Sequence, residues 1–421
     1  MSARFSDRTA VEPHASGRPG LVETVCDAVN ALVFRLDATP EIGFGHLARC
    51  ARLADMAEAR GHRVIVATSD PSRPHVAARL PRAKIVAPDT AERADILVHD
   101  HYGDHRLLDA PGFGHVVAFD DLDRLKGRAD VRLDATPPTA DEALVEAEDR
   151  GVVLRGPWFV PLDPAFAEAR VTKPSARRPR PRVLIAPGAT DPTNVASAAL
   201  DALAVIAADV DIEVVLSSAA PHAETVRRRA ESIGASPVFD ASDMATRLAA
   251  CDLAIGAGGV SAWERACLGV PTILAITADN QVRNARRLEA LGAARVVDAR
   301  DPGLTGRLAD ALTALLGDAT LRGTIGAASV ALCDGLGAAR LEAELFERPR
   351  VRLVPARMTD ADLVLKWQSE PGARDHARAP RVPTSEEHRA FMERTLADRR
   401  ELFLLIVEEA KGYARLATGS W

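Results

Sequence analysis

The sequence ALVFRL at residues 31–36, followed after a short loop by GFGHLARC at residues 43–50, decides the expected fold of the first part of the chain. The apolar hexapeptide is typical of a buried strand, and apolar residues then recur at helical spacing. Gly61 suits the left-handed position after a helix, and residues 63–68 form the next predicted strand. The stretch therefore predicts a β-loop-α-β unit, and ligands in open α/β sheets bind at such loops.

The loop between this strand and helix contains Gly43, Gly45 and His46. Glycines let the backbone approach a ligand closely. The positive end of the predicted helix disfavours a protonated imidazole, so we expect His46 to be neutral and able to accept a proton from water. A histidine that only caps or packs is the open alternative. The loop is not a dinucleotide fingerprint, because Ala48 stands where the third glycine would be.

Composition limits the classes of function. The chain has 421 residues, a formal net charge of −6 and only 4% aromatic residues, so neither nucleic acid nor an anionic membrane is an expected partner. Five cysteines without a CxxC pair suit a reducing cytoplasm, which is the expected location. No apolar run reaches the length of a membrane span.

Alternating strands and helices run through the chain twice, on either side of a basic, proline-rich linker at residues 173–182. An acidic segment at residues 140–150 favours a helix. Two such halves predict two doubly wound domains that face a cleft. The expected parts are a disordered tail at 1–29, an N-terminal α/β domain with the catalytic base at 30–172, a C-terminal α/β domain that binds the nucleotide at 173–347, and a third segment at 348–421.

The second half contains the run DLAIGAGGVSAWERACLGVP at residues 252–271. A strand ends in glycines and leads into a helix with Ser261 as the expected N-cap. Backbone amides around Gly258 and Gly259 can hold a diphosphate without a metal. Glu264, one turn into the helix, can accept hydrogen bonds from a ribose diol. Tight packing is the alternative explanation for the glycines.

Other polar residues follow predicted strands and could line the same crevice. The run HDHYGDH at 99–105 resembles a metallo-hydrolase motif, but one residue too many separates His101 from Asp104, so no metal site is predicted. Arg49 could meet a phosphate, and Asn194 could read a substrate or cap the following helix. The remaining candidates at strand ends are Asp37, Tyr102, Asn280 and Gln281.

Six motifs spread over residues 30–345 carry a family resemblance: Arg35-x-Asp37, Gly43-x-Gly45-His46-x-x-Arg49-Cys50, Asp100-His101-Tyr102, Asp120-Asp121, Ser261-x-Trp263-Glu264 and Asn280-Gln281. Together they resemble the UDP-sugar hydrolase of pseudaminic acid biosynthesis. The resemblance implies an α/β fold of the GT-B type, a pair of Rossmann-like domains facing a cleft. It also implies removal of UDP from UDP-2,4-diacetamido-2,4,6-trideoxy-β-L-altropyranose by attack of water on the anomeric carbon, with no cofactor and no metal.

One departure from the family is the loop Pro187-Gly188-Ala189, where such proteins usually have a Gly-Gly-x-Asp turn. A glycosyltransferase of the same fold and a non-catalytic nucleotide-sugar-binding module are the alternative functions.

The resemblance also implies roles for single residues. These roles are His46 as the base, Asp37 and Tyr102 near the sugar, Gly258, Gly259 and Ser261 around the diphosphate, Glu264 on the ribose, and Asn280 and Gln281 toward the diphosphate-sugar.

Residues 351–421 resemble the front part of a GNAT-type N-acetyltransferase, through Arg352-Leu353-Val354-Pro355, Trp367 and Glu387-His388. Such domains hold acetyl-CoA with a glycine-rich loop after their fourth strand, and the sequence contains no such loop. The segment is therefore expected to be an incomplete α+β domain that neither binds acetyl-CoA nor transfers an acetyl group.

Overall fold

The computed structural model describes residues 31–39, 43–92, 94–139, 142–148, 150–172, 180–347, 351–375, 377, 379–397, 401–408 and 416–420. The predicted disordered tail at 1–29 and most of the predicted linker at 173–182 lie outside these residues. Among the helices within these ranges, none has the length and apolar character needed to cross a membrane.

The first sheet has eight strands in the order β3-β2-β1-β4-β5-β6-β8-β7. All neighbours are parallel except β7 and β8. The strands are β1 (Ala31–Leu36), β2 (Arg63–Ala67), β3 (Lys84–Val86), β4 (Ile96–Asp100), β5 (His115–Phe119), β6 (Val131–Asp134), β7 (Val145–Ala147) and β8 (Val152–Arg155). The helical elements on this sheet are α1 (Gly45–Ala59), α2 (Pro74–Arg79), the short η1 (Pro88–Thr90) and α3 (Arg106–Asp109).

Side chains of β1 alternate between two apolar layers, as a strand buried on both faces requires. Leu32 and Phe34 pack in the layer that contains α1 and α2. Val33 packs in the opposite layer, together with Leu107 of α3. The predicted β-loop-α-β unit is confirmed, and α1 ends at Gly61, whose φ is +83°.

The helix predicted at residues 140–150 is wrong. The segment contains β7, which pairs antiparallel with β8. Gly151, with φ of +74°, turns the chain between the two strands, and a carbon at its Cβ position would lie 1.9 Å from the backbone oxygen of Asp130. The edge pairing with β8 therefore overrides the helical propensity of the acidic side chains.

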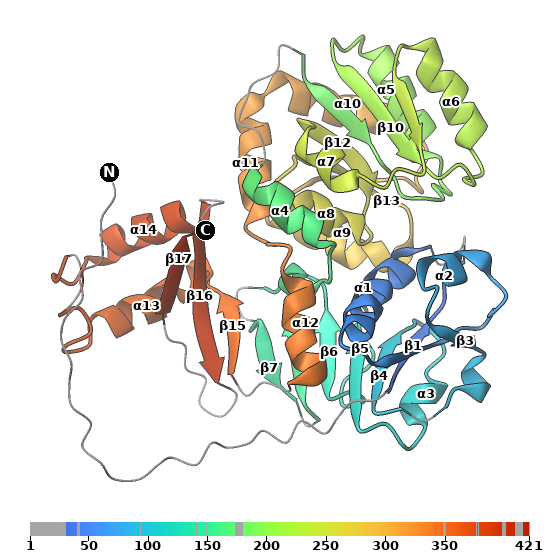
Figure 1. Ribbon diagram of the computed structural model, residues 1–421. Helices are drawn as coiled ribbons and strands as arrows, with labels where there is room; N and C mark the ends of the chain where they lie inside the picture. The colour runs from blue at the N-terminus through green and yellow to red at the C-terminus, as the bar shows by residue number, and fades with distance from the viewer. Residues whose placement is uncertain are drawn as a thin grey trace, which may run out of the picture.

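The second sheet has six parallel strands in the order β11-β10-β9-β12-β13-β14. They are β9 (Arg182–Ile185), β10 (Asp211–Leu216), β11 (Ser236–Phe239), β12 (Leu253–Ala257), β13 (Thr272–Ile276) and β14 (Arg295–Asp298). One face packs on α5 (Val195–Val205), α6 (Ala223–Ser232) and α10 (Leu304–Gly317). The other packs on α7 (Met244–Ala249), α8 (Ser261–Cys267) and α9 (Val282–Ala290), preceded by the short η3 (Asp279–Gln281). Figure 1 shows the two domains one above the other.

The chain crosses between the two domains twice, and each crossing leaves a helix on the other domain. The helix α4 (Pro164–Thr172) packs against α7 and α8 of the second domain. After α11 (Ala319–Val330), the helix α12 (Gly337–Phe346) returns to α1 and to the short η2 (Pro157–Phe159) of the first domain. Figure 1 shows α12 beside the first sheet. Sequence position assigned α4 to the first domain and α12 to the second, whereas their apolar faces pack in the opposite domains.

The third part is a small α/β unit beside β7 (Figure 1). Its antiparallel strands β15 (Val351–Pro355), β16 (Glu401–Glu408) and β17 (Leu416–Ser420) follow the order β15-β16-β17. Its helical elements are η4 (Met358–Asp360), α13 (Ala361–Gln368) and α14 (Ser385–Ala397). Arg352 bonds to Glu344 of α12 through a buried contact of 2.6 Å, which ties the unit to the first domain. Helices beside an antiparallel sheet agree with the expected α+β character, but they do not confirm a GNAT-type domain.

Gly337 should be essential for docking α12. A carbon at its Cβ position would lie 2.2 Å from the backbone oxygen of Val160, so Gly337→Ala forces α12 away from the segment that follows η2. We expect the free energy of unfolding to fall by about 1–3 kcal/mol. Gly306→Ala in α10 is the control, because nothing lies within 4 Å of its Cβ position, and alanine there should stabilise the helix by about 0.5–1 kcal/mol. Equal urea midpoints for the two variants would contradict this role of Gly337.

Candidate functional site

A cavity of about 710 Å³ lies between the two domains. Both sheets reverse strand order between two central strands, β1 and β4 in one and β9 and β12 in the other. Ligands in open α/β sheets bind beside the carboxyl ends of strands at such switch points. The segments that follow these four strands supply much of the lining: Gly43 to His46, Tyr102, Pro187 to Pro192, and Gly258 to Ser261.

His46 lies on the first turn of α1 and lines the cavity. Its Nδ1 is 2.5 Å from Oδ1 of Asp100, at the end of β4. A carboxylate at this nitrogen favours the tautomer with the proton on Nδ1 and leaves Nε2 as a proton acceptor. The imidazole also meets the Tyr102 ring edge to face, with 4.7 Å between centroids. The ring orientation is therefore held from two sides.

Asp100 is held by more than the histidine. Arg49 donates to both of its carboxylate oxygens, each at 2.6 Å, and to Asp121 at 2.8 Å. Burial alone would raise the pKa of Asp100, but the charge of Arg49 and the hydrogen bonds from Arg49 and His46 outweigh it and hold that pKa well below its ordinary value. Tyr102 donates to Asp121 at 3.4 Å. Arg49 thus lines the cavity as part of a buried network of one arginine and two aspartates.

The glycine turn on the opposite wall is held by Gln281. Its Oε1 accepts hydrogen bonds from the backbone N–H of Gly258 at 3.2 Å and of Thr277 at 3.0 Å. The Gly258 amide is therefore already used, whereas the sequence placed it around a diphosphate. At Gly259 a Cβ would meet nothing within 4 Å, so the cavity is open above this residue. Gly256 has a packing role, because a Cβ there would lie 2.6 Å from the backbone oxygen of Ala186.

Ser261 is the first residue of α8 and not its N-cap as expected. Val260 occupies the N-cap position, and no side chain caps the helix. The hydroxyl of Ser261 accepts a hydrogen bond from Arg265 at 3.2 Å. Its own hydrogen can therefore be donated into the cavity, which it lines.

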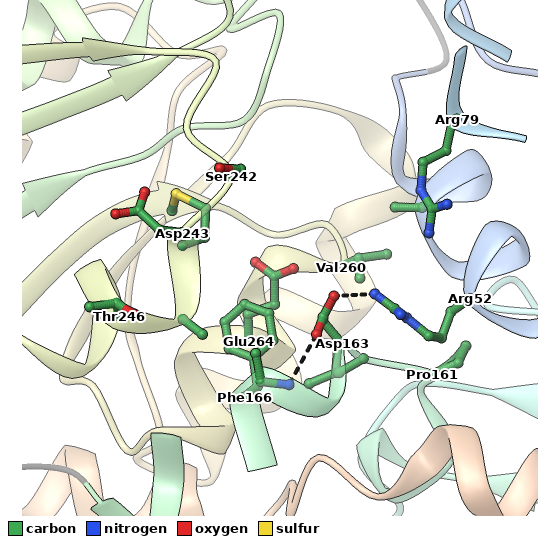
Figure 2. A pocket seen from close by; sticks show the side chains of 15 residues that line it. Arg52, Arg79, Pro161, Asp163, Phe166, Ser242, Asp243, Thr246, Val260 and Glu264 are labelled. Carbon is green, nitrogen blue, oxygen red and sulfur yellow. Dashed lines mark hydrogen bonds and ion pairs between the residues drawn. The ribbon is translucent and has the colours of Figure 1, made fainter. Parts of the chain in front are cut away.

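Glu264 lines the large cavity and also a second one of about 330 Å³. Figure 2 shows its carboxylate pointing into the second cavity, near Asp163 and Ser242. Arg52 closes that cavity on the other side and forms an ion pair with Asp163. Desolvation raises the pKa of Glu264 to about 7, and Asp163 adds to the rise, while Arg265 opposes it. Glu264 thus joins the two cavities.

Two predicted residues do not line the cavity. Asp37 is buried behind it, where it accepts hydrogen bonds from Arg35 at 2.9 Å, from Ser69 and from His101. Asn194 stands before α5 with φ of +53° and makes no side-chain cap. Asp191 caps this helix instead, accepting from the backbone N–H of Val195 at 2.8 Å and of Ala196.

Two amides on the second domain point to further contacts. Asn280 and Asn284 line the cavity, and the Oδ1 atom of each is buried without a hydrogen-bond partner. Asn284 was not among the residues predicted from the sequence, although its spacing of four residues from Asn280 was a usable signal. Asp100 and Asp121 stood in the family motifs but were not assigned to the site. The carboxylate spacing alone could not show that both bind Arg49.

The remaining acidic groups of the lining are bonded within the protein. Asp191 is engaged as a helix cap, and Asp279 is paired with Arg300. The Pro187-Gly188-Ala189 loop, which departs from the expected turn, lies on the cavity wall beside them. Among the residues that the structure describes, no cluster of three or more His, Cys, Asp or Glu side chains is arranged to hold a metal ion. A wall of this kind can accept an anionic ligand.

The fold and this cleft define a protein of the GT-B architecture, with two Rossmann-type α/β domains. MurG of Acinetobacter baumannii has this fold, with a TM-score of 0.53 and 15% identity over 76% of this chain and all of that one. The spinosyn rhamnosyltransferase SpnG in complex with thymidine diphosphate has a TM-score of 0.50 and 18% identity over 75% of this chain and all of that one. The Staphylococcus aureus MnaA–UDP structure has a TM-score of 0.50 and 13% identity over 75% of this chain and 96% of that one.

Similarity in sequence is found to one family domain and to one curated protein. Residues 182–321 match the glycosyltransferase family 28 C-terminal domain. The spore coat polysaccharide biosynthesis protein SpsG of Bacillus subtilis strain 168 is 34% identical over 146 residues, which are 34% of this chain. The matched part spans 42% of the length of SpsG. The glycine turn, Glu264 and Gln281 all lie within the matched family domain.

The raised pKa of Glu264 predicts a pH-dependent stability. The folded protein holds this proton more tightly than the unfolded chain does, so this group lowers the free energy of unfolding as the pH rises from about 4.5 to about 7. Glu264→Gln removes that cost. We expect the variant to gain about 2 kcal/mol over the wild type at pH 8 and much less at pH 5, measured by denaturant unfolding. An equal difference in the free energy of unfolding between the variant and the wild type at pH 5 and at pH 8 would contradict the raised pKa of Glu264.

Proposed function

We propose that this protein is a UDP-sugar hydrolase in which His46 activates the attacking water. The observation that carries the proposal is the pair of His46 and Asp100, held on one wall of a cavity whose other wall is the open turn at Gly259. A base fixed by a carboxylate, facing a wall suited to an anionic leaving group, is the arrangement that cleavage of a nucleotide-sugar needs.

The two cavities suggest how the nucleotide would lie. A ribose at Glu264 would have the smaller cavity on one side for its base and the glycine turn on the other for its phosphates. Ser261 would donate its hydroxyl hydrogen to a phosphate oxygen, and the amides after Gly258 would face the same group. Gln281 then acts indirectly, by fixing the turn through Gly258.

The proposed reaction is a displacement at the anomeric carbon. The water oxygen bonds to that carbon as the bond to the β-phosphate oxygen breaks, and UDP leaves with the electron pair. His46 takes the water proton on Nε2, and Asp100 stabilises the imidazolium that forms. Attack opposite the leaving group inverts the anomeric configuration. Tyr102, Asn280 and Asn284 would face the sugar. Asp37 and Asn194 have no part in this step.

The resemblance to the hydrolase of pseudaminic acid biosynthesis names the substrate to test, UDP-2,4-diacetamido-2,4,6-trideoxy-β-L-altropyranose. Two acetamido groups on a sugar offer both hydrogen-bond donors and acceptors. The unpartnered Oδ1 atoms of Asn280 and Asn284 suit such donors. The similarity to a spore coat polysaccharide biosynthesis protein supports a role in making an unusual surface sugar.

A glycosyltransferase is the second candidate. It is favoured by the match of residues 182–321 to the glycosyltransferase family 28 C-terminal domain. The nucleotide would bind in the same way, and His46 would take a proton from a sugar hydroxyl instead of water. Release of UDP without any acceptor sugar separates the two functions.

His46→Ala should remove the base while leaving nucleotide binding intact. We expect UDP release from the diacetamido substrate to slow by about 10²- to 10⁴-fold, because positioned bases contribute that much. The measurement is UDP formation in chelator without acceptor, beside UDP affinity by calorimetry. His62→Ala is the control, since His62 stacks on Phe346 outside the cavity lining.

Three results would count against this assignment. Near-normal turnover by His46→Ala would exclude His46 as the base. Loss of UDP affinity in proportion to turnover would give His46 a binding role instead. Wild-type protein that binds UDP but releases none would favour the transferase.

A further inference from the structure

Directly behind the glycine turn lies an arginine that has no negative partner. Arg265 is 1% exposed. Its guanidinium donates hydrogen bonds to the backbone oxygen of Ala257 at 2.6 Å and to the hydroxyl of Ser261 at 3.2 Å. Its Nε has no hydrogen-bond partner. Both acceptors are uncharged, so the positive charge of this side chain is not balanced by its bonds.

Three other buried arginines are balanced by carboxylates. Arg49 binds two carboxylates in the first domain. Arg35 and Arg132, which are also fully buried, each bind carboxylates as well. In the part of the chain that the structure describes, Arg265 forms no ion pair within 4 Å. Burying a charge without a partner is costly, and a group with such a burial usually serves a purpose.

The packing around Arg265 is built for a guanidinium. A carbon at the Cβ position of Gly256 would lie 2.4 Å from its Nη1 atom, so the glycine makes room for the side chain. Burial lowers the pKa of Arg265 to about 10, and the neighbouring Glu264 only partly opposes this. The side chain therefore remains a cation at neutral pH and lies one hydrogen bond away from the cavity, through Ser261.

We propose that Arg265 is a positioning residue for a diphosphate ligand, which supplies the missing negative charge from the other side of Ser261. Arg265 donates to the Ser261 oxygen, so the Ser261 hydrogen points away from it and is available to a phosphate oxygen. Its bond to Ala257 holds the start of the turn. The inference rests on the proposed function, because it assigns this wall to the phosphates of a nucleotide.

A purely structural arginine would behave differently. If Arg265 only held the turn through its hydrogen bonds, Arg265→Gln, which keeps a side-chain donor, would retain more of the preference for UDP than Arg265→Met does. If its charge balances the diphosphate, the loss should fall on UDP and spare uridine, which has no phosphate. The ratio of the two dissociation constants is therefore the readout that separates a charge role from a scaffold role.

The experiment measures the affinities of UDP and uridine by calorimetry for the wild type, Arg265→Met, Arg265→Gln and Arg265→Lys. Glutamine is the second neutral variant because it can still donate to Ala257. Arg170→Met is the matched control. Arg170 is also buried and donates to the backbone oxygens of Cys267, Val330 and Cys333, but it does not line the cavity.

We expect the preference of the wild type for UDP over uridine to fall by tenfold or more in both neutral variants. It should stay within about threefold of the wild type in Arg265→Lys and in Arg170→Met. An unchanged ratio in Arg265→Met or Arg265→Gln, with UDP still bound by the wild type, would overturn this inference and leave the proposed function standing. A wild type that binds neither UDP nor uridine would overturn both.

Discussion

The buried carboxylate of Asp100 is the constraint on which the first half of the cleft depends. It is 1% exposed and must have its oxygens satisfied within the protein. Its partners His46, Arg49 and Cys50 lie on one face of α1, with spacings of three and four residues from His46. The carboxylate thereby joins the end of β4 to the start of α1 and sets the direction of the imidazole. Arg49 extends the same network to Asp121 and Tyr102, so one ionic cluster positions most of this wall.

The wall of the cleft that the second domain supplies is held together by few charged groups. Its turn is held by an amide, Gln281, and by an arginine that binds only neutral oxygens. One wall is therefore an ionic network of one arginine and two aspartates that carries a base, and the other is an amide-lined surface with an unpaired positive charge behind it. Helix α9 joins the walls, because Arg283 pairs with Asp134 at 3.0 Å and Arg287 donates to the backbone oxygen of Pro137. This difference between the walls would give the proposed nucleotide-sugar a direction in the cleft.

The sequence predicted what depends on local pattern. The buried strands, the turns that follow β1 and β12, and the two doubly wound domains were readable, because apolar runs and glycines report the backbone directly, and the family resemblance implied the GT-B architecture. Contacts between distant segments were not. The edge strand β7 replaced a predicted helix because β8 offered it a partner. Asp191 took the cap that had been considered for Asn194, since its carboxylate, three residues earlier in the chain, accepts hydrogen bonds from the backbone N–H of Val195 and Ala196. The backbone N–H of Gly258, which was expected to face a diphosphate, donates to a side chain 23 residues away.

The central claim is that water attacks the anomeric carbon, and it is tested most directly by the fate of the water oxygen. The wild-type protein would be incubated with the UDP-diacetamido sugar in ¹⁸O-labelled water, with chelator and without acceptor, and both products would be analysed at once by mass spectrometry. We predict the label on the anomeric hydroxyl of the released sugar and none in UDP. Label in the β-phosphate of UDP would show attack at phosphorus. No release of UDP until a sugar acceptor is added would show a transferase, and either result would contradict the account.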